Sequence, residues 1–235
     1  MIKAKNERGE VLQSQLLLGV KEVAHYCSCR TCKEATQGVW MPRQVHSDRV
    51  VVLDEAMLAS ALPEADAVIT CLEGQWIGVR TADCVPVLLV DPVRRVVAAV
   101  HAGWRGTVAH IAGQTVRRMV DELGCRAGDI RAAIGPSIGP EAFEVGEEVA
   151  EAFVTAGRGD CIVRQLWGPS GWQPLSRPHI DLWQSNVMDL LDEGVELEHI
   201  DCTPWCTHTH NDLLFSARRE GIGTGRIVSA ICFVC

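Results

Sequence analysis

Two short apolar runs near the middle of the chain constrain the fold most. Residues 85–90 (VPVLLV) and 96–100 (VVAAV) contain no charged side chain and are joined by a turn that begins with Asp91-Pro92. Because both runs are short, rich in β-branched residues and apolar at every position, they predict strands that are covered on both faces. The turn between them predicts an antiparallel hairpin, with Cys84 directly before its first strand and His101 directly after its second.

Other strands and helices are distributed on either side of this hairpin. Short β-branched segments predict strands at residues 50–53, 67–70, 76–79 and 227–234. Apolar residues at helical spacing predict helices at residues 107–123, from 146 or 147 to about 156, and at 182–193. Thr107 is the expected N-cap of the first helix, and Gly124 its expected stop. We therefore expect a mixed α/β (α+β) fold over residues 1–235 as a single domain, without the Gly-rich turn of a dinucleotide-binding fold.

Charge and cysteine content narrow the class of protein. The 235 residues include 22 basic and 30 acidic side chains, and the formal net charge of -8 argues against a nucleic-acid partner. No apolar stretch approaches the roughly 20 residues that a bilayer crossing requires, and the charged N-terminus lacks a signal-peptide pattern. A cytoplasmic protein with no membrane partner is expected. The 11 cysteines are expected to be reduced, because disulfide scaffolds are shorter and richer in cysteine.

The hairpin suggests a chemical site at one end of its sheet. If the two strands pair antiparallel, Cys84 and His101 come within reach of a shared metal ion, or of each other as nucleophile and base. With one further imidazole, such as that of His46, they would suit Zn²⁺ and leave a fourth position for water. Imidazole and thiolate suit copper as well. The alternative is that His101 is a hydrogen-bonded core residue and Cys84 a buried thiol, and spacing alone does not bring His46 to the pair.

Several motifs occur in a fixed order along the chain. They are Gln44-Val-His46, Ala65-Asp-Ala67, Thr81-Ala-Asp-Cys-Val-Pro86, His101-Ala-Gly-Trp-Arg-Gly106, the segment IGPSIGPEAFEV at 134–145, FSARREG at 215–221, and Thr224-Gly-Arg226. Together they resemble the bacterial multicopper polyphenol oxidoreductase (laccase-domain) family, whose members are also described as purine nucleoside phosphorylases. The resemblance runs from about Gln44 to the C-terminus. Residues 1–43 diverge, and carry a Cys-rich stretch where the family usually has a Gly-Gly-Val-Ser-like segment.

The resemblance implies a fold, an activity and a ligand set. The fold would be a four-layer α/β/β/α sandwich with mixed sheets. The metal would be held by His46, Cys84 and His101, with zinc as the expected ion and copper as the alternative. Implied reactions are adenosine deamination and phosphorolysis of adenosine, inosine, guanosine or methylthioadenosine, so a purine nucleoside and phosphate are the expected partners. Copper-dependent oxidation of phenols is an older assignment of the family, and some members are linked to peptidoglycan editing.

Neighbouring residues suggest supporting roles. Asp83 is a candidate catalytic residue that would orient a metal-bound histidine or move a proton, although its place beside Cys84 predicts a side chain on the opposite face. Arg105, Ser216 and Arg218 are candidates for binding substrate or phosphate, the arginines through their planar forks. Gly103 and Gly106 are expected to allow unusual backbone torsions next to Arg105, so that backbone N–H groups face an anion. The alternative for both arginines is pairing with acidic neighbours. The family pattern also differs at Ser47, usually glycine, and at Ala217, often aromatic.

The remaining cysteines leave a second metal site open. They group as Cys27, Cys29 and Cys32; as Cys202 and Cys206 with His208 and His210; and as Cys232 and Cys235. Four of these residues could bind a structural zinc ion or an iron-sulfur cluster. The alternative is burial as small apolar side chains, which is common for free cysteine.

Two other functions remain open from the sequence. In one, Cys84 is a nucleophile activated by His101 without a metal, in a hydrolase or amidase that acts on an amide of a cell-wall precursor. In the other, the chain is a non-enzymatic metal-binding or partner-binding module built on the additional cysteines. The sequence makes no prediction about the oligomeric state.

Overall fold

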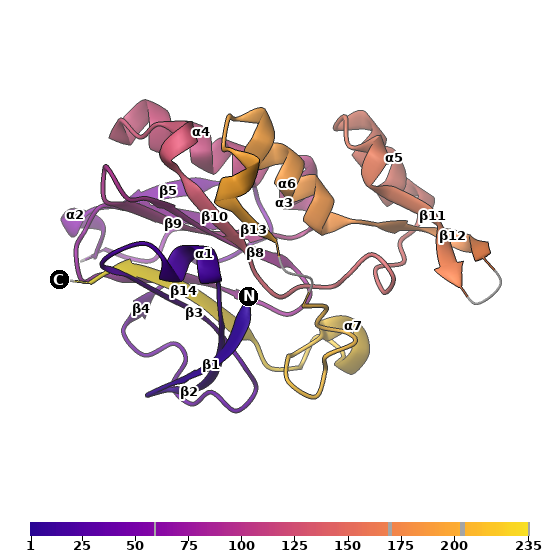
Figure 1. Ribbon diagram of the computed structural model, residues 1–235, viewed down its shortest axis with the longest axis horizontal. Coiled ribbons are helices and arrows are strands. Elements are labelled where there is room, and N and C mark those ends of the chain that lie inside the picture. The colour runs from indigo at the N-terminus through magenta and orange to yellow at the C-terminus, as the bar shows by residue number, and fades with distance from the viewer. Residues whose placement is uncertain (59, 169–170, 203–204, 235) are drawn as a thin grey trace.

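The computed structural model describes residues 1–58, 60–168, 171–202 and 205–234, and two mixed β-sheets form its centre (Figure 1). The predicted hairpin is confirmed: β8 (Val85–Asp91) and β9 (Val96–Ala102) pair antiparallel, with Val87 opposite Val100. Every residue of both strands is buried. Their side chains alternate between a helical layer on one face and the second sheet on the other. The expectation of strands covered on both faces is therefore confirmed.

The hairpin lies in the middle of a six-stranded sheet with the order β13-β10-β8-β9-β6-β5. Its remaining strands are β5 (Val50–Leu53), β6 (Ala67–Thr70), β10 (Arg131–Ile134) and β13 (Ile200–Cys202). The outer pairs β5·β6 and β10·β13 are parallel and the inner pairs antiparallel. The predicted strands 50–53 and 67–70 are confirmed with the same bounds.

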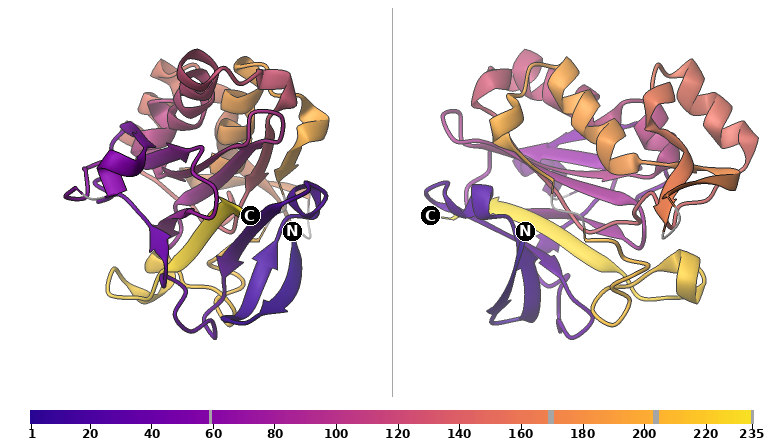
Figure 2. Two further views of the ribbon diagram at one scale, coloured as in Figure 1. Left: turned by 90° about the vertical axis from the view of Figure 1, so that its left-hand side faces the viewer. Right: turned by 45° about the vertical axis from the view of Figure 1, so that its right-hand side comes forward.

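The second six-stranded sheet has the order β1-β2-β3-β14-β7-β4. Its strands are β1 (Ile2–Asn6), β2 (Gly9–Gln13), β3 (Val23–Ser28), β4 (Val39–Trp40), β7 (Trp76–Thr81) and β14 (Ile227–Phe233). Aliphatic side chains of this sheet, among them Ile77, Val79 and Ile231, pack between the two sheets against Leu88 and Val97. The sheets thus lie face to face (Figure 2), as the apolar surfaces of both require.

Helices cover the outer face of the hairpin's sheet. They are α3 (Trp104–Val108), α4 (Ile111–Leu123) and α6 (Leu182–Asp192); α5 (Glu147–Thr155) continues this helical layer to the side, where it packs against β12 (Gly171–Ile180). The predicted helices near 147–156 and 182–193 are confirmed, and Gly124 ends α4 in the left-handed conformation with φ 66°. Mixed α/β layering with two mixed sheets is confirmed.

One predicted helix is two helices. The helix is interrupted at His110, which has a left-handed φ of 58°. The prediction of one helix over 107–123 was therefore wrong at its start. Thr107 is not an N-cap but a buried residue inside α3, whose hydroxyl accepts a hydrogen bond from Asn186 Nδ2. The break turns α4 so that its apolar stripe, including Ile111, Val116 and Met119, faces the sheet.

The remaining elements are short or project from the layers. They include α1 (Gln15–Leu18), α2 (Glu55–Leu58), α7 (Ala217–Glu220) and the antiparallel pair β11 (Ile162–Gly168) and β12 (Gly171–Ile180). Single 3-10 turns lie at Ala127–Asp129, Gly159–Cys161 and Leu197–His199. The β11–β12 hairpin extends away from the sheets (Figure 1), and the exposed Trp167 and Trp172 lie opposite each other in its two strands. Within the described ranges, no helix has the length and apolar character needed to cross a membrane.

Candidate metal and active site

Three predicted ligands come together at one end of the hairpin's sheet. Cys84 directly precedes β8, and His101 lies in β9 opposite Pro86, so the hairpin register brings their side chains to the same end. His46 reaches them from the segment between β4 and β5. The ligand atoms of the three residues all lie within 4.8 Å of one another. The two imidazole rings meet edge to face, with centroids 4.9 Å apart and planes at 81°.

Asp66 holds two of the candidate metal ligands in position through hydrogen bonds. Its Oδ1 is 2.8 Å from Nδ1 of His101, and its backbone carbonyl accepts a hydrogen bond of 2.7 Å from the His101 amide. The same carboxylate accepts hydrogen bonds from the amides of Val45, His46 and Ser47 and from the Ser47 hydroxyl. Asp66 is completely buried. One carboxylate therefore fixes both the ring of His101 and the backbone that carries His46.

The charges of the site favour a thiolate at Cys84. Burial alone would raise the pKa of this thiol, but hydrogen bonds and charge from His101 and His46 lower it to about 6. Burial would lower the pKa of His101, but Asp66 and Cys84 raise it to about 9. Burial would also raise the pKa of Asp66, yet hydrogen bonds from His101 and Ser47 hold it at about 2. Asp66 and Cys84 thus carry negative charge around His101 at neutral pH.

The donor set and the space between the donors fit a metal ion. Two imidazoles and a thiolate are the ligands that zinc and copper prefer, and three protein ligands leave one coordination position open. Because Asp66 is bonded to Nδ1 of His101, the other ring nitrogen is available for a metal. Gly103 leaves the space at the site clear: a Cβ atom there would lie 3.1 Å from Cys84 Sγ and 3.3 Å from His46 Cδ2.

A pocket of about 530 Å³ opens beside the three ligands. It is lined by Arg43, Gln44, His46, Arg80, Thr81, Ala82, Cys84, His101, Ala217, Ile222 and Arg226. Gln44 fixes one wall, because its side-chain amide donates to the carbonyl of Arg80 and accepts from the Arg80 amide, both at 2.8 Å. These two bonds continue the pairing of β4 with β7 and set the position from which His46 enters the site.

Asp83 lies in a different hydrogen-bond network from the one that sequence reasoning suggested. Its carboxylate accepts hydrogen bonds from the Thr207 hydroxyl and the Arg218 amide, both at 2.6 Å. The residue adopts a φ of 86°, a rare conformation for a side chain other than glycine. The carboxylate that orients a candidate metal ligand is Asp66, and Asp83 instead connects the segment before β8 to α7.

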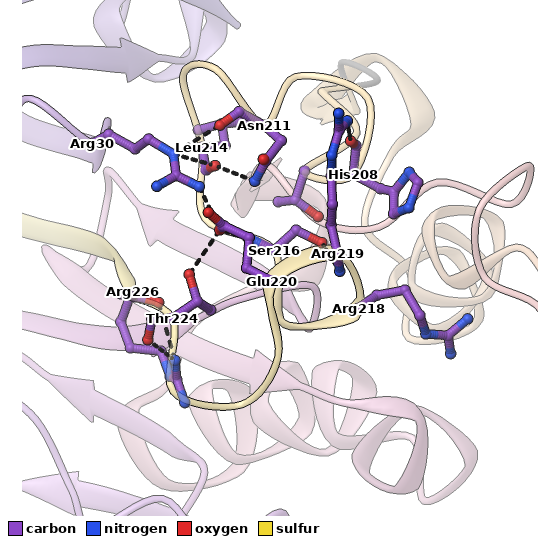
Figure 3. Close-up of polar contacts among 12 residues, drawn as sticks. Arg30, His208, Asn211, Leu214, Ser216, Arg218, Arg219, Glu220, Thr224 and Arg226 are labelled. Carbon is purple, nitrogen blue, oxygen red and sulfur yellow. Dashed lines mark hydrogen bonds and ion pairs between the residues drawn. The ribbon is translucent and has the colours of Figure 1, made fainter.

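The three residues predicted to bind substrate or phosphate lie outside the pocket lining. Ser216 is buried and caps α7 by accepting a hydrogen bond from the Arg219 amide. The Arg218 guanidinium donates to the carbonyls of Ala142 and Glu144 and points away from Glu220 (Figure 3). Arg105 is exposed on α3 and lies over the Trp104 ring, 4.3 Å from its centroid.

The expectation of unusual backbone torsions at Gly103 and Gly106 was wrong. Gly103 is extended, with φ −70° and ψ 170°, and neither it nor Gly106 has a positive φ. Position 103 needs glycine because a Cβ atom there would crowd the sulfur of Cys84. At Gly106 the reason is also contact, because a Cβ atom would lie 3.2 Å from Ile111 and 3.3 Å from the Ser47 carbonyl.

The other cysteines form no second metal cluster within the described ranges, and Cys235 lies outside them. Cys27 is buried, and its sulfur accepts a hydrogen bond from the Ser229 hydroxyl at 3.2 Å. Cys206 is buried and accepts from the Gly139 amide at 3.2 Å. Burial raises the pKa of Cys27 to about 12 and that of Cys29 to about 11. These thiols serve as core residues, the alternative that their spacing had left open.

Sequence reasoning missed the role of Asp66 and the basic side chains of the pocket. An aspartate between two alanines at the start of a buried strand is a signal, because a buried carboxylate requires partners. Arg43 and Arg80 gave no such signal, since exposed arginines are common on any surface. Arg226 appeared only as part of a motif.

Comparison with known proteins identifies the family. The sequence profile of the family described as multi-copper polyphenol oxidoreductase laccase matches residues 21–234. The chain belongs to this family. The laccase-like profile thus includes His46, Cys84 and His101 and about half of the divergent N-terminal part, residues 21–43.

Named relatives of this laccase-like chain are nucleoside enzymes. A protein of Bacteroides thetaiotaomicron named purine nucleoside phosphorylase is 41% identical over 198 residues, which are 81% of this chain and 72% of the relative. A protein of an unknown prokaryotic organism named adenosine deaminase RL5 is 43% identical over 200 residues, 81% of this chain and 73% of the relative.

Solved structures of similar fold support the architecture. The crystal structure of YlmD from Geobacillus stearothermophilus superposes with a TM-score of 0.84 at 23% identity, and covers 100% of this chain and 99% of its own. The Bacillus licheniformis hypothetical protein YfiH superposes with a TM-score of 0.73 at 29% identity, over 83% of this chain and 74% of its own. The laccase-like chain therefore shares its fold with these proteins.

Proposed function

We propose that this chain is a metal-dependent purine nucleoside enzyme that phosphorolyses purine nucleosides and deaminates adenosine. The observation that carries the proposal is the convergence of His46, Cys84 and His101 within 4.8 Å at the wall of a pocket of about 530 Å³. Relatives more than 40% identical are named purine nucleoside phosphorylase and adenosine deaminase. The pocket has the size of a small-molecule site.

The residues of the site have separate tasks in this proposal. His46, Cys84 and His101 would hold the metal, with zinc as the proposed ion. When bound, zinc supplies Lewis-acid chemistry and lowers the pKa of a coordinated water. Asp66 accepts the Nδ1 proton of His101 in a hydrogen bond, which fixes the ring and its tautomer. The lowered pKa of Cys84 keeps its sulfur deprotonated and ready for a metal ligand bond at neutral pH.

The two proposed reactions differ in what attacks the nucleoside. In phosphorolysis, a phosphate oxygen forms a bond to C1′ of the ribose and the C1′–N9 bond breaks. The electron pair leaves with the purine N9, which takes up a proton, so the products are the free purine and ribose 1-phosphate. In deamination, water adds at C6 of adenosine and ammonia leaves, giving inosine. Only the first reaction consumes phosphate, so the two can be assayed separately.

Metal analysis together with nucleoside assays tests the proposal. We expect about one zinc ion per chain in protein purified without added metal, with hypoxanthine released from inosine in the presence of phosphate. Cys84→Ala should lose both metal and turnover. Cys71→Ala is the matched control, because Cys71 is an exposed thiol outside the site. Metal-free wild-type protein without nucleoside turnover would contradict the proposal, and copper with phenol oxidation would favour the older assignment of the family.

One observation favours a second candidate, a cysteine hydrolase acting on an amide of a cell-wall precursor. In the protein without metal, Cys84 and His101 have the opposed pKa shifts of a thiolate and an imidazolium, with Asp66 behind the imidazole. A thioester between substrate and Cys84, detected by mass spectrometry in chelator-treated protein that is active on amides, would support this candidate. Activity that requires the metal would exclude it.

A further inference from the structure

The pocket beside the candidate metal ligands is positively charged. Three arginines, Arg43, Arg80 and Arg226, line it, and no aspartate or glutamate is among the described residues that do so. The chain as a whole carries a formal net charge of -8, so this local excess is opposite in sign to the average surface. A concave wall of one charge next to a reactive centre is typical of a site that attracts a small ion of opposite charge.

The three guanidinium groups have donors to spare. An arginine carries five N–H donors. The Arg80 guanidinium lies in the lining of the pocket and forms no hydrogen bond or ion pair with the side chain or backbone of any described residue. Arg43 contacts a single carboxylate, that of Glu64. Arg226 donates three bonds to the carbonyls of Ile222, Thr224 and Gly225 in its own loop (Figure 3), which leaves two of its donors unused.

The fold holds the backbone of Arg80 firmly while its side chain stays free. Arg80 lies in β7, where its neighbours Val79 and Thr81 are buried and its own side chain is exposed. Val228 of β14 is its pairing partner on one side. On the other side, both backbone polar groups of Arg80 are bonded by the Gln44 side chain. The guanidinium therefore reaches the pocket from a backbone position that is hydrogen-bonded to Gln44, which lies two residues before His46.

We infer that this pocket binds inorganic phosphate, with Arg80 as its principal residue and with Arg226 and Arg43 beside it. The inference rests on the proposed function, because phosphorolysis requires phosphate next to the nucleoside. The planar fork of arginine matches two oxygens of a phosphate, and the Arg80 guanidinium, which has no partner among the described residues, loses no existing bond when it binds one. The assignment replaces Arg105, Ser216 and Arg218 as phosphate ligands.

Kinetics of the two reactions test the role of Arg80. We expect Arg80→Met to raise the KM for phosphate in phosphorolysis about 10- to 100-fold, the effect of losing a charge-assisted contact. Adenosine deamination without phosphate should fall by a smaller factor than phosphorolysis does, because only phosphorolysis uses the anion that Arg80 is inferred to bind; equal losses in both reactions would overturn the phosphate assignment. Arg80→Lys, which keeps the charge but loses the fork, should lie between wild type and Arg80→Met. Arg126→Met is the matched control, because the Arg126 side chain is 85% exposed and outside the pocket.

Direct binding separates failure of the inference from failure of the proposed function. Calorimetric titration of inorganic phosphate into the purified protein should show binding in wild type and Arg126→Met, and weaker binding in Arg80→Met. If wild type phosphorolyses nucleosides but Arg80→Met keeps the phosphate affinity of the control, the inference is wrong and the proposed function stands. If no nucleoside reacts but phosphate binds through Arg80, the site stands and the proposed reaction does not.

A second titration identifies the chemistry of the anion. Acetate and succinate carry carboxylates of similar charge, and a cell-wall precursor would present such groups. Weaker binding of both than of phosphate is expected. Tighter binding of succinate, with the same loss in Arg80→Met, would overturn the assignment to phosphate. Melting temperatures of all variants should stay within about 2 °C of wild type, because the Arg80 guanidinium has no partner among the described residues and the Arg126 side chain is exposed.

Discussion

Asp66 and His101 are joined twice, once through side chains and once through backbone. The carboxylate meets Nδ1 of the ring at 2.8 Å, and the Asp66 carbonyl accepts from the His101 amide at 2.7 Å. The strands β6 and β9 are antiparallel neighbours, so the pairing of the sheet itself delivers the carboxylate to the imidazole. Orientation of the candidate ligand is thus built into the strand register.

Replacing this carboxylate should weaken metal binding. In Asp66→Asn the charge behind His101 is lost, and an amide group faces the donors of Ser47. We expect zinc affinity to fall about 10- to 100-fold, the usual effect of losing the partner of a metal-bound histidine. Competition with a chromogenic chelator measures it. Asp48→Asn, an exposed neighbour, should bind zinc like wild type, and equal affinities for the two variants would refute the role of Asp66.

Filling the space at Gly103 should also remove the metal. A methyl group there would lie 3.1 Å from Cys84 Sγ and 3.3 Å from His46 Cδ2, closer than ordinary contact, so the ligands must separate. Gly103→Ala is expected to contain less than about a third of the wild-type metal by mass spectrometry, with a similar far-ultraviolet circular dichroism spectrum. Gly223→Ala is the control, because a Cβ atom there meets no atom within 4 Å. Full metal content in Gly103→Ala would contradict the packing argument.

The thiol at the centre of the site should react at unusually low pH. His101 and His46 overcome the effect of burial and lower the pKa of Cys84 to about 6, from an ordinary value of 9. In chelator-treated protein, alkylation of Cys84 by iodoacetamide should therefore stay fast as the pH falls from 9 to about 6, and decline only below that. Peptide mass spectrometry in a Cys71→Ser background follows this one site. A rate that already falls tenfold between pH 9 and 8 would be evidence against the thiolate.

A histidine outside the site should make stability depend on pH. His25 is buried, its Nε2 accepts from the Ser14 amide, and burial lowers its pKa to about 4. The unfolded chain gains a proton near pH 6.5 but the folded chain only near pH 4, so the free energy of unfolding decreases as the pH falls through this window. The pKa of His25 differs between the unfolded and folded chains by enough to lower the free energy of unfolding by about 3 kcal/mol at pH 4 and below.

Urea unfolding of a His25→Gln variant isolates this contribution. Between pH 7 and pH 4, the free energy of unfolding should decrease less in the variant than in wild type. The difference between the two decreases should be about the contribution assigned to His25. His208→Gln, a histidine on the segment before α7, serves as the control and should follow wild type. Parallel pH profiles for wild type and His25→Gln would show that His25 is not the group responsible.

The sequence predicted the strands that are apolar at every position and missed the features set by local backbone conformation or by exposed residues. The strands 50–53 and 67–70 were predicted with the observed bounds because both are short and rich in β-branched residues; 67–70 is buried throughout, and 50–53 is buried at its two ends. The break at His110 was missed because a left-handed histidine leaves no mark in the apolar periodicity. The β11–β12 hairpin was missed because its residues are mostly exposed or half-buried and follow no clear alternation.

The candidate site was predictable in part for a similar reason. Cys84 and His101 followed from the hairpin, since one turn fixes which residues lie at its open end. His46 is distant in sequence, and only the family resemblance connected it with the pair. Asp66 and Arg80 depend on strand order within two sheets, which one sequence does not reveal.

The segment from Gln44 to Ser47 has a thermodynamic consequence. Gln44 binds it to β7 in one sheet, while Asp66 binds it to the start of β6 in the other. A ligand bound through His46 therefore favours the arrangement in which both sheets are in place. Its binding free energy should appear in the cooperative unfolding of the whole molecule, so that metal raises the melting temperature in a single shifted transition and neither sheet alone retains the affinity.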